Sequence, residues 1–180
     1  MNFLPAIRHI CMTRPKVIQS KMYRENPIIR IANVLTNVSI DDFDSRLKLQ
    51  KIGFLAQELG AHTGFAFNWY RRGPYSPSLT RMLYSAEELG MLRIDNVELT
   101  ASEKKIVRHL RELLGRDIND SRTLELFASV WYFLPNSGPS KRDKERIVEV
   151  LVENKPQFER HELLEALERI IAFREKMRIS

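Results

Sequence analysis

The chain has 180 residues, of which 43% are hydrophobic and 29% are charged, so it can bury one hydrophobic core with a helical appendage and lacks the composition of a disordered protein. Cys11 is the only cysteine, which excludes an internal disulfide and a cysteine-based metal site. No apolar run approaches the roughly 18 residues of a membrane span and no secretion signal develops near the N-terminus, so we expect a cytoplasmic protein.

The net charge of +6 is concentrated at one end of the chain. Residues 1–24 contain no acid, whereas the remainder contains 24 bases and 23 acids. The bases of this N-terminal arm are Arg8, Arg14, Lys16, Lys21 and Arg24. A nearly neutral body argues against a duplex-binding face, because binding to phosphates needs basic residues. The arm is therefore either a contact to nucleic acid or an acidic partner, or a solvated terminus.

Two helices are predicted at the start of the body. Asn26 is suited to an N-cap and Pro27 to the first helical position, and apolar residues at helical spacing follow. After a linker, Asp44 or Ser45 is expected to cap a second helix. Its apolar stripe ends at Gly60, a residue typical of the position after a helix.

A strand and a hairpin are predicted to form a small antiparallel sheet. Residues 65–70 alternate in polarity and are rich in aromatic residues, which indicates a strand. A helix over 77–89 follows. Residues 91–94 and 97–99 are two short alternating segments, and the Asp-Asn pair between them tolerates the left-handed backbone of a tight turn. We interpret 91–99 as a hairpin, or wing, that pairs with the strand.

The next segments predict two helices and a linker. Thr100 and Glu103 form a capping box that starts a helix ending at Gly115. The helix over 121–134 is apolar nearly all round, which is typical of a helix central to a core or an interface. The prolines and glycine of residues 135–140 exclude regular structure, so this is a linker.

The C-terminal part predicts a pair of charged helices, over 141–154 and 157–177, separated by Pro156. Their dense mixture of acids and bases is typical of a solvated surface. One stripe nevertheless needs a partner surface, either the body or a second copy of the chain. It consists of Leu163, Leu167, Ile170, Ile171 and Met177.

No motif points to catalysis, a metal or a cofactor. The glycines are dispersed and form no phosphate-binding loop, and the histidines at 9, 62, 109 and 161 have no metal-ligand spacing. Asp41, Asp42 and Asp44 crowd together, but they precede a helix whose free N–H groups they can cap. The nuclease-like set of Asp95, Glu103 and Lys105 falls at a helix start rather than on a strand. We therefore expect a non-enzymatic protein without a cofactor.

The turn after the predicted strand is the candidate contact surface. Gly73 and Pro74 turn the chain and display Arg71, Arg72 and Tyr75 beside the start of the next helix. Arginine and tyrosine dominate the energy of many protein interfaces. The predicted partner-binding residues are Arg71, Arg72, Tyr75 and Arg81. The alternative for the turn is purely structural, with Tyr75 packed on the helix and Ser76 as its cap.

Several ordered motifs resemble the YwgA-like proteins and, more distantly, the Panacea-type antitoxin domain. The motifs are Arg-Leu-Lys-Leu-Gln-Lys-Ile at 46–52, Phe-Asn-Trp-Tyr at 67–70, Gly-Pro-Tyr-Ser-Pro-Ser-Leu at 73–79 and Leu-Thr at 99–100. The resemblance covers about residues 45–103. It implies no catalysis and, through the antitoxin domain, direct binding to a toxin or other protein. Arg72 and Ser78 stand where the relatives usually have an aromatic residue and an acid, which implies a different partner.

We therefore predict a mainly α protein with a small antiparallel sheet, an α+β fold with a winged-helix-like core and a C-terminal helical extension. Its parts are an arm (1–24), the core with its following helices (25–134), a linker (135–140) and a C-terminal helical pair (141–180). The predicted function is a regulatory or antitoxin-like protein-binding module, with homodimerisation as one role of the last helices. The alternative is a DNA-binding regulator, although Arg81 is the only base in its recognition helix.

Overall fold

Helices make up most of the chain in the computed structural model, which describes residues 21–136 and 139–179. In chain order the elements are α2 (Pro27–Leu35), α3 (Phe43–Glu58), β1 (Asn68–Tyr70), β2 (Gly73–Tyr75), α4 (Pro77–Glu88), α5 (Ala101–Leu114), the short 3-10 helix η1 (Gly115–Asn119), α6 (Ser121–Phe133), α7 (Lys141–Asn154) and α8 (Arg160–Ile179). The two strands pair antiparallel. The predicted class, mainly α with a small antiparallel sheet, is confirmed.

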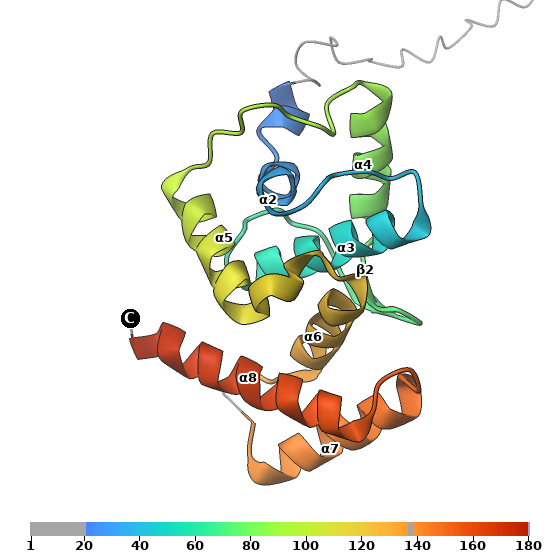
Figure 1. Cartoon of the computed structure of the whole chain (residues 1–180), viewed down its shortest axis with the longest axis vertical. Helices are drawn as coiled ribbons and strands as arrows, with labels where there is room; N and C mark the ends of the chain where they lie inside the picture. Colours follow the sequence, from blue (N-terminus) through green and yellow to red (C-terminus); the bar gives the residue numbers. More distant parts are fainter. Residues whose placement is uncertain (1–20, 137–138, 180) are drawn as a thin grey trace, which may run out of the picture.

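Helix α6 is the central element of the molecule. It lies between a group formed by α2, α3, α4 and α5 and the C-terminal pair α7 and α8 (Figure 1), and it packs against α3 on one side and α8 on the other. Residues 124–131 are all buried, including Glu125 and Ser129. The prediction that this all-round apolar helix is central to a core is confirmed. It also means that polar side chains on α6 need partners inside the protein.

The caps predicted for α2 and α5 are confirmed. Asn26 accepts hydrogen bonds from the first turn of α2, and the Thr100–Glu103 capping box starts α5. The start of α3 was predicted wrongly, because its N-cap is Asp42 rather than Asp44 or Ser45. Asp42 accepts hydrogen bonds from both the backbone N–H and the hydroxyl of Ser45. The carboxylate of Asp42, two residues before Asp44, therefore satisfies free donors of the first turn of α3.

The predicted strand over 65–70 is only partly correct. Strand β1 covers its last three residues and pairs with β2 through a two-residue connection, Arg71–Arg72, instead of pairing with a distant hairpin. Phe65 stays outside the sheet because the side-chain amide of Gln57 bonds both its N–H and its carbonyl. Gly73 closes the connection with a φ of +81°, a left-handed conformation that glycine adopts without strain.

The predicted wing over 91–99 is wrong. This segment contains no strand, because side chains of α2 take its backbone groups. Asn33 donates to the Leu92 carbonyl and accepts from the Ile94 N–H, while Arg30 donates to the carbonyl of Glu98. Asn96 does adopt the left-handed conformation expected of the turn, with a φ of +53°.

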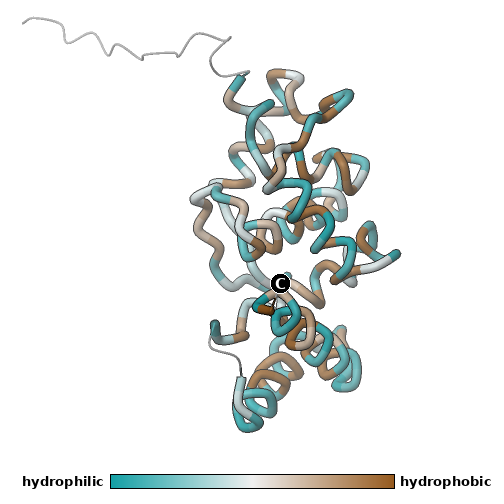
Figure 2. The backbone as a smooth tube through the Cα atoms, turned by 90° about the vertical axis from the view of Figure 1, so that its left-hand side faces the viewer, coloured by the Kyte–Doolittle hydropathy of each residue, from teal (hydrophilic) through white to brown (hydrophobic). Residues whose placement is uncertain are grey.

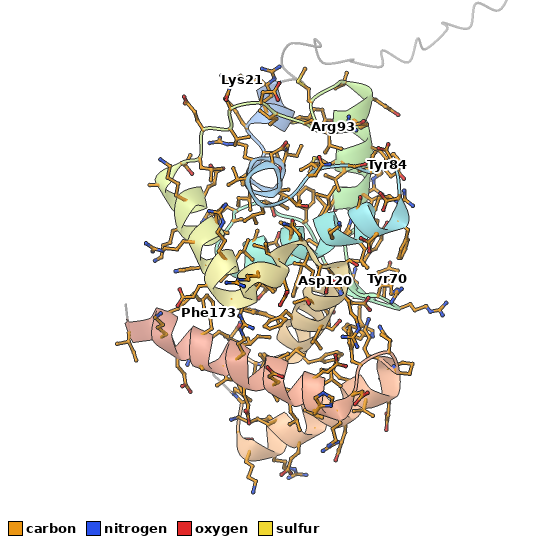
Figure 3. The ribbon with its side chains drawn as sticks, in the orientation of Figure 1. Lys21, Tyr70, Tyr84, Arg93, Asp120 and Phe173 are labelled. Carbon is orange, nitrogen blue, oxygen red and sulfur yellow. The ribbon has the colours of Figure 1, made fainter. Side chains whose placement is uncertain are left out.

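The C-terminal pair folds back on the body. Its apolar stripe, with Leu163, Leu167 and Ile170, is buried within the chain, and Phe173 packs against Trp131 of α6 and His109 of α5. Figure 3 shows Phe173 where α8 approaches the body. Helix α8 begins at Arg160 rather than at 157 as predicted. In Figure 2 this pair carries both hydrophobic and hydrophilic residues, in keeping with one buried and one solvated side.

None of the helices in the described parts of the chain is long and apolar enough to cross a membrane.

Substitution of Gly73 tests how tightly the hairpin fits against α6. A Cβ at Gly73 would lie 2.5 Å from the Ser129 hydroxyl oxygen, whereas one at Gly64, which also has a positive φ, would meet nothing within 4 Å. We expect Gly64→Ala to cost about 1–2 kcal/mol through backbone strain alone. Gly73→Ala should cost about 2–5 kcal/mol, because overpacking adds to that strain. Urea denaturation measures both, and equal losses would contradict the close fit.

Candidate functional site

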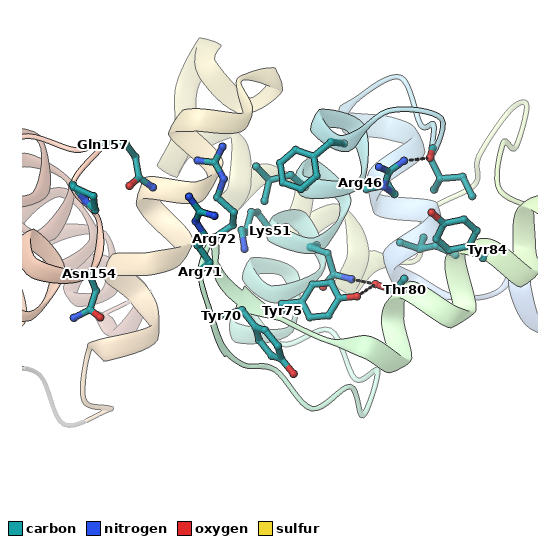
Figure 4. Close-up of a pocket in the computed structure, with 17 residues that line it drawn as sticks. Arg46, Lys51, Tyr70, Arg71, Arg72, Tyr75, Thr80, Tyr84, Asn154 and Gln157 are labelled. Atoms are coloured by element: carbon teal, nitrogen blue, oxygen red, sulfur yellow. Dashed lines mark hydrogen bonds between the residues drawn. The ribbon is translucent and has the colours of Figure 1, made fainter.

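A pocket of about 970 Å³ opens where four parts of the chain meet. Its walls come from Ile40 and the first half of α3, the β1–β2 hairpin, the middle of α4, and the end of α7 with the segment that joins it to α8, as Figure 4 shows. Residues far apart in the sequence are brought together here, since Gln157 contributes to the same cavity as Arg46. A volume of this size is within the range of ligand-binding cavities.

The charged side chains that line the pocket are all basic: Arg46, Lys51, Arg71 and Arg72. No Asp or Glu is among its lining residues. Arg46 donates to the carbonyl of Ile40 at 2.7 Å, which holds its guanidinium at the wall between α3 and α4. The exposed Arg71 side chain has no hydrogen bond or ion pair with the described residues. The pocket is therefore suited to an anionic group.

Aromatic side chains gather around the same opening. Phe43, Tyr70 and Tyr84 are 56%, 48% and 43% exposed, and they are the exposed large aromatic residues in the part of the chain that the structure describes. All three line this pocket. Figure 3 shows Tyr70 and Tyr84 on the same side of the molecule. Exposed apolar surface that gathers around one pocket is typical of a binding site.

A hydrogen-bonded network fixes the wall between α3 and α4. The Gln50 amide donates to the Thr80 hydroxyl at 2.8 Å and accepts from the Ser76 N–H at 2.9 Å. The Thr80 hydroxyl donates in turn to the Tyr75 hydroxyl at 2.8 Å, and the Tyr75 ring meets that of Tyr70 edge to face. This part of the pocket is preorganised because its polar groups hold one another.

A buried carboxylate holds the other wall together. Glu125 on α6 is 2% exposed and binds the Lys155 ammonium at 2.7 Å, the Arg72 guanidinium at 3.1 Å and the Gln157 amide at 2.8 Å. Lys155, also fully buried, donates to the Arg71 carbonyl at 2.8 Å and lies 5.0 Å from the Trp69 ring centre. The α7–α8 connection is thus attached to both the hairpin and α6.

Lys51 lies beside this cluster without a carboxylate of its own. Its ammonium donates to the Pro74 carbonyl at 2.7 Å and has no acidic partner within 4 Å among the described residues. Burial and the neighbouring Lys155 lower its pKa to about 7, although Glu125 opposes the shift. Burial also lowers the pKa of Lys155, against the opposing hydrogen bond of Glu125. Behind the pocket wall at Lys51, basic groups therefore outnumber acidic ones.

The structure brings three of the four predicted partner-binding residues together. Arg71, Arg72 and Tyr75 all line the pocket, whereas Arg81 is exposed on α4 and does not. Arg72 has a structural contact as well, because it pairs with Glu125. Ser76 caps α4, as the structural interpretation of the turn predicted.

Of the predicted arm, residues 21–24 are described, and they include Lys21 and Arg24. Lys21 lies 3.8 Å from Glu25, and both side chains are mostly exposed. Arg8, Arg14 and Lys16 lie outside the described residues.

Three central residues were not predicted: Lys51, Glu125 and Lys155. Glu125 did carry a signal, since a lone acid inside a helix that is apolar all round must find a partner. Lys51 stands between Gln50 and Ile52 on a helix that is buried on most sides, and its motif was noted only as a resemblance. Lys155 had no signal, because it follows a charged helix typical of a solvated surface.

The acidic cluster before α3 has structural contacts. Asp42 is the cap, Asp44 pairs with Lys48 at 3.3 Å, and Asp41 accepts from the Ser39 hydroxyl at 2.7 Å. Among residues 21–136 and 139–179 no group of three or more His, Cys, Asp or Glu residues could hold a metal ion.

Comparison of the chain with protein-family models, with curated proteins and with solved structures found no match. The resemblance of residues 45–103 to YwgA-like proteins therefore stays a prediction.

Replacement of Glu125 should destabilise the protein strongly. Glu125→Gln leaves the buried Lys155 without its counter-charge, and loss of one member of a buried ion pair typically costs about 3–5 kcal/mol. Glu149→Gln on α7, whose side chain is exposed, is the control and should change the free energy of unfolding by less than about 0.5 kcal/mol. Urea denaturation at pH 7 measures both. A loss under about 1 kcal/mol in Glu125→Gln would contradict the role of this carboxylate.

The lowered pKa of Lys51 predicts a change of stability with pH. Between its folded pKa of about 7 and its ordinary value of 10.5, the unfolded chain binds the extra proton, so the free energy of unfolding rises with pH. Lys51→Met removes this titration. From pH 7 to pH 9 the wild-type protein should gain roughly 2 kcal/mol in free energy of unfolding relative to Lys51→Met. If the difference in free energy of unfolding between wild type and Lys51→Met stays constant from pH 7 to pH 9, the pKa of Lys51 is ordinary.

Proposed function

We propose that this chain is a non-enzymatic regulatory module that binds another protein at the pocket between α3, the β1–β2 hairpin and α4. The observation that carries the proposal is the gathering of the exposed aromatic residues Phe43, Tyr70 and Tyr84 around a cavity whose charged lining is wholly basic. Aromatic residues and arginine are enriched among the residues that dominate interface energy.

The rigidity of the site supports the same proposal. The Gln50 network and the Glu125 cluster fix opposite walls of the pocket before any partner arrives. Preorganised walls reduce the entropy lost on binding, so contacts made here contribute more affinity than contacts on mobile side chains. The resemblance to the antitoxin domain favours a toxin, or another protein whose activity is held in check, as the partner.

The DNA-binding alternative has less support. Arg81 is the only base on α4, and Glu87 and Glu88 end that helix. Phosphate-facing helices normally present several bases. A pocket is moreover a poor complement to the convex backbone of a duplex, whereas a peptide segment fits into it.

Capture of partners from the native host, with nucleic acids digested, tests the proposal. The full chain is compared with Phe43→Ala/Tyr84→Ala, at the pocket, and with Val152→Ala/Leu164→Ala, whose exposed apolar side chains lie on α7 and α8 outside it. We expect to recover a protein that the Phe43→Ala/Tyr84→Ala variant captures about tenfold or more weakly than the wild-type chain does, because aromatic anchors dominate the energy of interfaces. The control variant should capture it normally.

Two results would count against the proposal. One is that no captured protein distinguishes the pocket variant from the control. The other is that all capture disappears when nucleic acids are digested, which would favour the DNA-binding alternative.

A further inference from the structure

Lys51 lines the pocket and lies beside a buried cluster in which basic groups outnumber acidic ones. Three basic side chains, Lys51, Lys155 and Arg72, surround the single carboxylate of Glu125. Glu125 pairs directly with two of them, at 2.7 Å and 3.1 Å, and its contact with Lys51 is longer than 4 Å. A buried cation is costly unless an anion pairs with it.

Lys51 has unused hydrogen-bonding capacity as well as unpaired charge. An ammonium has three donors, and one is used by the Pro74 carbonyl. Its side chain is 1% exposed, yet it lines the pocket, so an occupant can reach it while water is largely excluded. A charge-assisted bond formed there is stronger than one at the surface.

The surroundings of Lys51 limit what the anion can be. Arg71 stands at the opening with its side chain exposed, and beside the Gln50–Thr80 pair the walls present the apolar and aromatic side chains of Leu47, Leu83 and Tyr75. An occupant therefore needs an anionic group joined to an apolar body. The single buried ammonium of Lys51 matches a singly charged carboxylate. A phosphate dianion would need further buried donors.

We propose that the pocket binds a carboxylate carried by an acidic, apolar segment of the partner protein, with the carboxylate on Lys51 and the apolar side chains against the aromatic wall. This inference rests on the proposed protein-binding function and names the chemistry of the segment that is bound. The carboxylate comes either from an Asp or Glu side chain or from the C-terminus of the partner.

Calorimetric titration of the full chain with short synthetic peptides tests the inference. The first peptide alternates acidic with apolar residues and has an amidated C-terminus; the second has Asn and Gln in place of the acids; the third is the second with a free C-terminus. We expect binding of the first or the third, which identifies the source of the carboxylate, and at least about tenfold weaker binding of the second. Equal affinities, or binding of inorganic phosphate alone, would overturn the inference.

Variants of the chain assign the contact to Lys51. Lys51→Met should weaken carboxylate binding about tenfold or more, while Lys48→Met, on the same helix but outside the pocket, should leave it unchanged. If Lys51→Met does not fold, Arg71→Gln and its control Arg142→Gln, both at exposed positions, make the same comparison at the mouth. If neither Lys51→Met nor Arg71→Gln loses binding, the assignment of the contact to Lys51 is wrong.

The pH dependence is a second readout. The charged groups that face Lys51 are Lys155, Glu125 and Arg72. Burial, together with Lys155 and Arg72, lowers the pKa of Lys51 to about 7, and Glu125 opposes that shift. The ammonium form dominates below that pH, so peptide affinity should fall as pH rises from 6 to 8, and the fall should be absent in Lys51→Met. A partner that depends on Phe43 and Tyr84, combined with no preference for carboxylate peptides, would overturn this inference and leave protein binding in place.

Discussion

The buried carboxylate of Glu125 is the interaction on which the arrangement of the site depends. It binds Lys155 from the α7–α8 connection and Arg72 from the β1–β2 hairpin, and it stands on α6 between the two halves of the molecule. Burial of a charge is unfavourable unless its partners are present, so these three segments can be correctly placed only together. The connection between the C-terminal helices is thereby part of the pocket, which Asn154, Pro156 and Gln157 line.

The same arrangement leaves an imbalance that gives the pocket its chemistry. One carboxylate cannot neutralise Lys51, Lys155 and Arg72, and Lys51 is the member without a direct acidic partner. Proteins retain such costly groups where they serve recognition, since they can be paired when a ligand arrives. In the binding mode that we propose, the exposed aromatic residues at the rim and the buried ammonium of Lys51 contact different parts of one bound segment.

Local rules were sufficient for much of the fold. The caps at Asn26 and Thr100 and the all-round apolar α6 follow from side-chain chemistry and periodicity alone. The sheet was harder, because its formation depends on which polar side chains take the backbone groups of each segment. Asn33 and Gln57 do so for two segments that have the alternation of strands, and neither contact is visible in the sequence. For the site, the turn residues were predictable, but Lys155 was not, since its partner is 30 residues away in the chain.

The ionisation of Lys51 decides whether the pocket contains a buried cation without a carboxylate of its own. Its pKa can be measured in the full chain by NMR titration of the Lys51 side-chain resonances, assigned by comparison with Lys51→Met. We predict a midpoint near 7, because the ammonium is buried beside Lys155 without its own carboxylate. A midpoint near the ordinary value of 10.5 would contradict it, because Lys51 would then be solvated or paired and the pocket would have no uncompensated cation.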